Sequence, residues 1–333
     1  MKMKKIILLF TLASLVYVNS DAQSGKPAVK VFSNFNYDLS TEEGEDAFKE
    51  FEFKRSYLGY SYKFDEKFSA KVTFDVGSNS AGSAYTAFLK IASLSWKYNE
   101  NMTINFGQIG TKNFKFMEKA WGKRYIYKSL QDQQKWANSA DLGVTMDYSI
   151  TDNLSVDMQV LNGEGYKNTQ SSDGLMRGGA GIIYKMGNMA FRLSRDLLPR
   201  SSYSSNDVSQ TISTLAGVYE MNMLKIGGEY NIQENASNVL DNNKNGMSVY
   251  GDYKISDNYS VFGRYDKISS EDADGSQWNL AKDGELTILG IQRKMTKGVT
   301  IALNIQTWKD ATLEGEEEAK NESTLYLNLE YKF

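Results

Sequence analysis

The chain has 333 residues, a formal net charge of -3, only two prolines, and neither cysteine nor histidine. Without cysteine there is no disulfide framework and no thiolate metal site, and without histidine the commonest general base and neutral metal ligand are missing. We therefore expect no enzyme, no resident metal and no cofactor, while so small a net charge identifies no partner.

The first residues predict a secretory signal peptide. Lys2, Lys4 and Lys5 precede an apolar stretch at 6–18, and a site of small residues follows at 20–22. The apolar stretch is too short to cross a bilayer as a helix. We expect residues 1–22 to be removed and residues 23–333 to form one mature domain outside the cytoplasm.

A short polar turn recurs along the rest of the chain, each time between two stretches in which apolar and polar residues alternate. The gaps between successive turns are 35, 52, 35, 35, 35 and 40 residues, taking as markers Asp65, Glu100, Asp152, Gly187, Asn222, Asp257 and Lys297. One tight turn, two strands and one longer loop per repeat are typical of an up-and-down antiparallel meander. Seven turns and the two ends of the chain predict about 16 strands.

The alternation is strict in several stretches, among them 68–76, 140–148, 154–160 and 299–305. A soluble β-sandwich also alternates, but strands of roughly 9 to 12 residues match a tilted strand that crosses a bilayer. Because an open meander has unpaired edges, we expect closure. The sequence thus predicts an all-β fold, a transmembrane antiparallel up-and-down β-barrel.

The last strand has an apolar face that ends on aromatic residues, formed by Leu325, Leu327, Leu329, Tyr331 and Phe333. Such an ending looks like the signal that hands outer-membrane barrels to the barrel assembly machinery. We therefore interpret Tyr331 and Phe333 as an assembly signal. The alternative is a soluble protein that happens to end on a strand.

The 52-residue gap contains the third long loop, residues 111–136, whose seven basic and two acidic residues give +5. A helix over 112–125 would separate two faces. One face carries Phe114, Met117, Trp121 and Tyr125, and the other carries Lys112, Lys115, Lys119 and Lys123. Gly122 weakens this helix, and Phe116 and Arg124 do not fit the division.

We expect this third loop to fold inward with its lysines and Arg124 facing the lumen, because basic rings favour anions in narrow pores. Lys71 and Arg264 lie on predicted lumen faces and would extend the basic path, although Asp75 and Asp266 interrupt it. The alternative is a solvated, cationic surface helix. Export makes nucleic acid improbable as a partner of the basic segment.

Three long loops are acidic, at 42–46, 271–274 and 314–318. They would bridge divalent cations to lipopolysaccharide or hold calcium. Solvated loop charge is the simpler interpretation, because no loop shows an ordered ligand spacing with the required glycine.

Five segments resemble the phosphate-selective porin O and P family: 51–59 (FEFKRSYLG), 67–74 (KFSAKVTF), 107–108 (GQ), 139–143 (SADLG) and 162–166 (NGEGY). Members of this family are 16-stranded outer-membrane barrels, commonly trimeric, with lysines on an inward loop and an arginine-lined conduit for phosphate or polyphosphate. The resemblance implies that Lys115, Lys119 and Lys123 form the constriction. It also implies a homotrimer in the outer membrane of a Gram-negative bacterium, in contact with lipid and lipopolysaccharide.

The chain departs from the family in two ways. No proline follows Gly107-Gln108, and there are only eight arginines. The solute therefore stays open. We expect a passive diffusion channel that prefers small anions, phosphate among them. The alternatives are a non-conducting barrel that serves as receptor, adhesin or scaffold, and a soluble periplasmic β-protein that binds glycans through its tyrosines.

Overall fold

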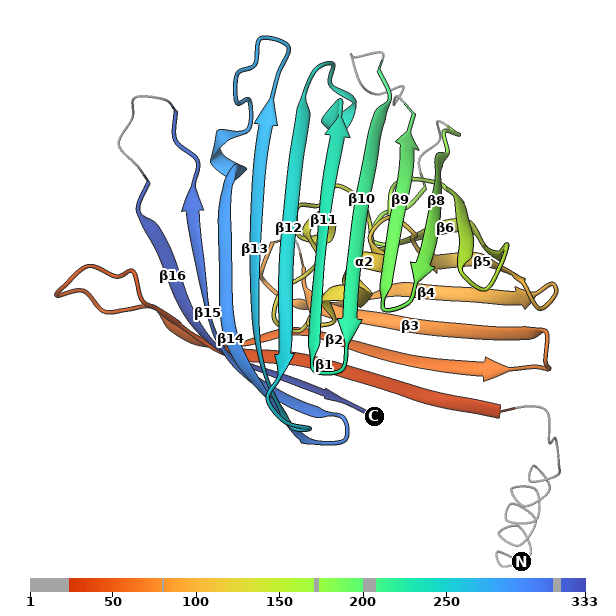
Figure 1. Ribbon diagram of the computed structural model, residues 1–333, viewed down its shortest axis with the longest axis horizontal. Coiled ribbons are helices and arrows are strands. Elements are labelled where there is room, and N and C mark those ends of the chain that lie inside the picture. The colour runs from red at the N-terminus through yellow and green to blue at the C-terminus, as the bar shows by residue number, and fades with distance from the viewer. Residues whose placement is uncertain (1–23, 80, 171–173, 200–207, 314–318) are drawn as a thin grey trace, which may run out of the picture.

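A computed structural model describes residues 24–79, 81–170, 174–199, 208–313 and 319–333, and in it the chain forms one closed antiparallel β-barrel (Figure 1). The strands are, in chain order, β1 (Ser24–Asp38), β2 (Lys49–Lys63), β3 (Phe68–Ser78), β4 (Tyr85–Lys97), β5 (Met102–Gly110), β6 (Ala140–Ser149), β7 (Leu154–Leu161), β8 (Arg177–Met186), β9 (Met189–Leu198), β10 (Gln210–Met221), β11 (Leu224–Glu234), β12 (Asn243–Lys254), β13 (Tyr259–Glu271), β14 (Gly284–Thr296), β15 (Val299–Asp310) and β16 (Asn321–Lys332). Among the described residues, the helical segments are α2 (Lys115–Trp121), α3 (Leu130–Gln133), η1 (Ala236–Asn238) and η2 (Leu280–Lys282).

The barrel closes where its first and last strands meet. Each strand pairs with its neighbours in sequence, and β1 pairs with β16 in a register that sets Val31 opposite Tyr331. Closure leaves no strand edge open to another chain. The predicted 16-stranded, closed, up-and-down barrel is therefore confirmed, with strands of 8 to 15 residues rather than 9 to 12.

The two faces of the wall differ as the alternation predicted. In β15, Leu303 is 47% exposed whereas Asn304, its neighbour, is 2% exposed. In β7, Met158 and Val160 are exposed, while Gln159 between them is buried. Large apolar side chains therefore point outward and polar ones inward, the arrangement of a barrel whose outer face meets lipid.

Tight turns gather at one end of the barrel, which we call the turn end, and the longer connections gather at the other, the loop end. At the first turn the Asp65 carboxylate accepts hydrogen bonds from the backbone N–H groups of Lys67 and Phe68, at 2.7 and 2.6 Å. Gly187 and Asn222 open two-residue turns with φ of +56° and +49°, as the twist of a hairpin requires. Short turns are periplasmic and longer loops extracellular in outer-membrane barrels.

Several predictions fall on the ends and the loops. The signal peptide at 1–22 and the acidic segment 314–318 lie outside the described residues, so both stay predictions. Tyr331 lies on the exposed outer side of β16, and Phe333 is exposed beyond it. Within the described residues, no helix has the length and apolar character needed to cross a membrane.

Candidate pore and the third loop

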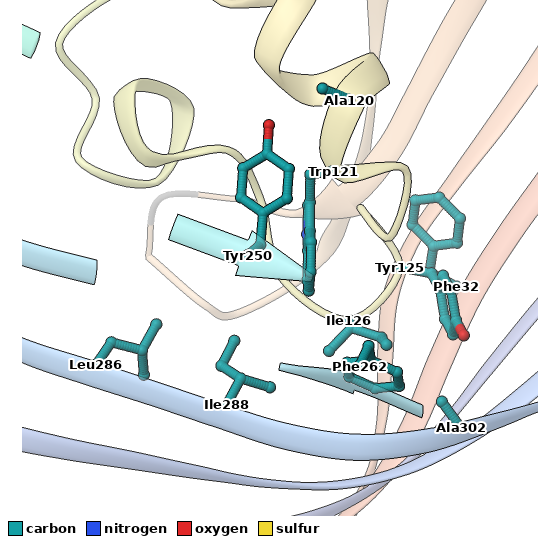
Figure 2. Close-up of a cluster of buried hydrophobic side chains, with 10 residues drawn as sticks. All are labelled: Phe32, Ala120, Trp121, Tyr125, Ile126, Tyr250, Phe262, Leu286, Ile288 and Ala302. Carbon is teal, nitrogen blue, oxygen red and sulfur yellow. The ribbon is translucent and has the colours of Figure 1, made fainter. Parts of the chain in front are cut away.

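One face of the third loop is apolar and packs on the inner wall. Trp121 lies with its ring centroid 5.5 Å from Tyr250 of β12 and 6.2 Å from Phe262 of β13. Figure 2 shows Trp121 and Ile126 of the loop together with wall residues such as Ile288 of β14. Burying each large side chain stabilises this docking by about 1.5–3 kcal/mol.

The helix in this loop is shorter than the sequence suggested. We expected helix over 112–125, but α2 ends at Trp121 because Gly122 adopts the left-handed conformation, with φ of +69°. Its N–H donates to the Glu118 carbonyl and closes the last turn. All four residues of the predicted apolar face are nevertheless buried: Phe114, Met117, Trp121 and Tyr125.

Hydrogen bonds fix the loop beyond α2. Gln131 of α3 is fully buried, and its side-chain amide donates to Thr214 Oγ1 of β10 at 2.8 Å and to Asn231 Oδ1 of β11 at 2.7 Å. Further along the wall, the Asn328 amide of β16 donates to the Tyr125 carbonyl at 3.4 Å. The loop is thus tied to three strands as well as packed on them.

Arg264, a predicted pore residue, lies beneath the loop. Its guanidinium is fully buried and pairs with Asp266 through two bonds of 2.8 and 2.7 Å. It also donates to the Lys128 carbonyl at 2.7 Å. In this position Arg264 holds the third loop against β13, and its charge is balanced by Asp266.

The four predicted loop lysines fall into two pairs. Lys112 and Lys123 are only 7% and 6% exposed. Lys112 forms an ion pair of 2.5 Å with Asp147 of β6, and Lys123 forms one with Asp252 of β12. Their charges are therefore compensated locally.

Lys115 and Lys119 are exposed and form no ion pair with any residue that the structure describes. Lys115 lies between two cavities of about 500 and 410 Å³ and lines both, whereas Lys119 lines the second. Burial lowers the pKa of Lys115 below its ordinary value, and the nearby charge of Lys112 lowers it further. Of the four predicted loop lysines, these two are therefore the uncompensated charges beside the cavities.

Arg124 occupies a third kind of environment. It pairs with Glu118 at 2.5 Å and with Asp132, and its Nε donates to the Tyr57 hydroxyl of β2 at 3.2 Å. Burial alone would raise the pKa of the Asp132 carboxyl, but the Arg124 guanidinium holds that pKa below its ordinary value. Arg124 lines the 500 Å³ cavity and joins the loop to β2.

Lys71 belongs to a larger basic group that the sequence reasoning did not assemble. It lines both the 500 Å³ cavity and a further cavity of about 570 Å³ at the turn end. In the register of the sheet, ten lysines near the turn end point inward; we call them the turn-end lysines. They are Lys26, Lys30, Lys63, Lys71, Lys97, Lys185, Lys225, Lys254, Lys294 and Lys332.

Few carboxylates oppose the turn-end lysines. Inward-facing acids at this level of the wall are Asp147, Asp157, Glu220, Asp252 and Glu330, and Arg192 is a further base, so eleven basic residues and five acids leave +6. Moreover, Asp147 and Asp252 already pair with loop lysines. Alternation could have identified this set, because it assigns Lys71 and its neighbours to the lumen face.

The structure also brings together, at and beside the 500 Å³ cavity, charged residues that we did not predict to lie in the pore. Lys90 of β4 lies 3.5 Å from Asp75, and Arg55 of β2 lies 3.3 Å from the same carboxylate. The Lys90 ammonium also stands 4.9 Å from the ring centroid of Tyr57. The bulge in the β3–β4 pairing, between Thr73 and Phe74, hides Lys90 from a strict period-2 pattern.

Among the described residues no group of three or more acidic side chains is arranged to hold a metal ion. Instead, the lumen contains two open spaces that share Lys115 in their lining, and a third that shares Lys71 with the first. Such an arrangement can bind or conduct anions without any covalent step.

Comparison with known proteins supports a porin-type channel. Residues 29–183 match the family model described as phosphate-selective porin O and P. No curated protein matches the chain in sequence.

Solved structures share the fold. The outer-membrane channel DcaP of Acinetobacter baumannii aligns with a TM-score of 0.69 and 14% identity, covering 95% of this chain and 99% of its own. An anion-selective porin from Comamonas acidovorans aligns with a TM-score of 0.67 and 12% identity, covering 93% and 100%. The trimer form of OmpT from Vibrio cholerae gives 0.61 and 15%, covering 94% and 100%.

Proposed function

Because residues 29–183 carry the phosphate-selective porin O and P match within a closed barrel of sixteen strands, we propose that this chain is an outer-membrane diffusion channel that prefers small anions. Its place would be the outer membrane of a Gram-negative bacterium, with the turn end in the periplasm. Transport of this kind needs positioned charge and open space, and no catalytic group.

The observation that carries the proposal is the pair of uncompensated lysines, Lys115 and Lys119, beside cavities that continue toward the turn-end lysines. Fixed positive charge on a narrow, low-dielectric wall attracts anions and repels cations. Two members of the predicted set, Lys112 and Lys123, would act on selectivity less, since each has a carboxylate partner. Arg264 would hold the loop in position rather than interact with the passing ion.

Phosphate is one candidate solute among small anions. We expect no arginine-lined conduit like that of the family, because arginines are few and Arg177 and Arg192 pair with Asp196 and Asp157 respectively. Lysine ammonium groups act as point charges without the planar fork that matches phosphate oxygens in two places. We therefore expect general anion preference, with phosphate competing as one anion among others.

The partners of such a channel follow from its outer face. Exposed apolar side chains on every part of the wall, such as Leu215, Leu289 and Leu327, would contact lipid. The trimer form among the similar structures favours a homotrimer here. Assembly through Tyr331 and Phe333, and contact with lipopolysaccharide, belong to the same proposal.

A plugged barrel that acts as receptor or scaffold is the second candidate, because the third loop fills the part of the lumen next to β12–β14 with apolar side chains. Planar-bilayer conductance separates the two functions. We expect discrete channel steps and, in a KCl gradient, a reversal potential of the sign given by chloride. A folded, heat-modifiable barrel without channel steps would contradict the channel.

Selectivity is tested by Lys115→Glu combined with Lys119→Glu. We expect the reversal potential to move toward cation preference, because two uncompensated positive charges become negative. Lys267→Glu is the control, since Lys267 lies on the exposed outer wall beside Glu285. An unchanged potential in the double variant would remove these two lysines from the mechanism.

A further inference from the structure

The two ends of the lumen carry opposite fixed charge. At the turn end the inward-facing wall has a surplus of positive charge from the turn-end lysines. At the loop end, five acidic residues point inward from neighbouring strands; we call them the loop-end carboxylates. They are Asp38, Glu50, Glu52, Asp310 and Glu322.

The orientation of Glu50 and Glu52 follows from the register of β1 and β2. Glu52 stands opposite Asn34, and Glu50 stands opposite Asn36. Both asparagines are buried on the lumen side and donate to these carboxylates, at 3.2 and 3.4 Å. Asp38 lies two residues beyond Asn36 and so shares its face.

The inward orientation of Glu322 and Asp310 follows from that of Trp308 of β15. Trp308 packs against the apolar clusters of the third loop, so it points inward. Glu322 stands opposite Trp308, and Asp310, two residues along β15, accepts a hydrogen bond of 2.6 Å from the Trp308 indole. Both carboxylates therefore border the lumen at the loop end.

These carboxylates have little compensation. At the loop end of this sector, formed by β15, β16, β1 and β2, the described inward-facing cations are Arg55, which pairs with Asp75, and Lys54, at the bulge in β2, which lies 2.9 Å from Glu52. Five acids and one lysine leave -4. Elsewhere at this level, Arg177 is balanced by Asp196 at 2.5 Å. Lys244 of β12 faces inward opposite Ser270 and is offset by Asp283, which accepts a hydrogen bond from the Ser270 hydroxyl. A negative mouth thus stands in series with a positive constriction and a positive turn end.

We propose that the pore rectifies: it conducts more current when the loop side is positive than when it is negative. This inference rests on the proposed function as a channel. A positive zone admits anions and a negative zone admits cations, so the polarity decides whether ions gather or are depleted at the junction between the zones.

The direction follows from the order of the zones. With the loop side positive, anions move from the turn end through the lysine zone, while cations enter through the loop-end carboxylates. Both meet at the junction, raise the local ion concentration there and increase conductance. With the loop side negative, both ions leave the junction, and conductance falls.

Salt controls the size of the effect. Fixed charges act over about 10 Å at 0.1 M ionic strength but only about 3 Å at 1 M. Rectification should therefore be clear in dilute KCl, with currents of opposite polarity differing roughly two-fold, and should nearly vanish near 1 M.

The test is the single-channel current–voltage curve of the full barrel in dilute and concentrated KCl. The orientation of the barrel in the bilayer is determined with Ala81→Cys, in the exposed loop between β3 and β4. Because the chain has no cysteine of its own, a bulky, impermeant thiol reagent then reacts only from the loop side. We expect the higher current with that side positive, in dilute salt.

Glu50→Gln with Glu52→Gln should make the curve more symmetric while leaving the anion preference in place or increased. The matched control is Glu234→Gln with Glu285→Gln, because these two exposed acids lie on the outer wall beside Arg195 and Lys267. A symmetric wild-type curve in dilute salt, or rectification of the opposite sign, would overturn the proposal. Either outcome would leave conductance and reversal potential as independent tests of the channel itself.

Discussion

The two faces of the third loop contact the rest of the barrel in different ways. The face toward β12–β14 is dry, and Trp121 is fixed there between aromatic side chains of the wall. On the face toward the cavities, Lys115 and Lys119 have no carboxylate partner among the described residues. Lysines occur on both sides of this division, since Lys112 and Lys123 are buried and paired.

The total charge of a segment therefore does not predict the electric field that the segment produces in the pore. The loop carries +5 in sequence, yet wall carboxylates compensate two of its lysines and acidic residues of the loop itself compensate Arg124. What a passing ion meets depends on where each ammonium lies relative to the carboxylates of the barrel.

The Trp121→Ala substitution tests the packing of the apolar face of the loop on the wall. The change should remove about 3–5 kcal/mol of packing from the loop and let it leave the wall. We expect a several-fold rise in single-channel conductance together with weaker anion preference, measured in planar bilayers. Leu303→Ala, on the exposed outer wall, is the control. Wild-type conductance in the Trp121 variant would show that this packing does not set the width of the pore.

The paired lysines are tested by Lys123→Met. It leaves the Asp252 carboxylate without its partner, at a cost of about 2 kcal/mol, because a partly buried charge is uncompensated. We expect lower resistance to urea unfolding in lipid vesicles and noisier channel currents. Adding Asp252→Leu should recover most of the stability. If the single and the double variant unfold alike, the pair does not hold the loop.

The exposed lysines can be examined through pH. Because the pKa of Lys115 is lowered from 10.5, this side chain loses its positive charge at a lower pH than an ordinary lysine. The anion preference, measured as the reversal potential in a KCl gradient, should therefore decline as the pH is raised toward the lowered pKa of Lys115.

The matched variant for this titration is Lys115→Arg, which keeps its charge at alkaline pH because a guanidinium stays protonated in proteins. It should retain more of the anion preference than the wild type in the same window. Identical pH profiles for the two proteins would exclude Lys115 as the titrating group.

The sequence predicted the barrel well because each part of the signal is local. Seven turns counted the strands, and alternation assigned residues such as Leu303 and Asn304 to opposite faces. The buried face of the loop was predicted for the same reason, since Met117 and Trp121 lie one helical turn apart. Register within each hairpin then follows from turn geometry, and closure follows because the edges of β1 and β16 would otherwise be unpaired.

The site was predicted less fully because its electrostatics depend on contacts between distant residues. The residues near Lys123 in the sequence do not indicate its ion pair with Asp252, and those near Lys128 do not indicate the hydrogen bond that its carbonyl accepts from Arg264. The left-handed Gly122 ended the helix early and set Lys123 apart from the exposed lysines. The turn-end lysines were each within reach of the alternation rule, but only the closed barrel brings them around one lumen.

The central claim is that uncompensated lysines, not total basic charge, select the ion. It is tested most directly by the reversal potentials of two double variants in one KCl gradient. Lys115→Gln with Lys119→Gln removes two free charges, whereas Lys112→Gln with Asp147→Asn removes an ion pair without changing the net charge. We predict a clear loss of anion preference in the first and a wild-type potential in the second. Equal potentials in the two variants would contradict the account.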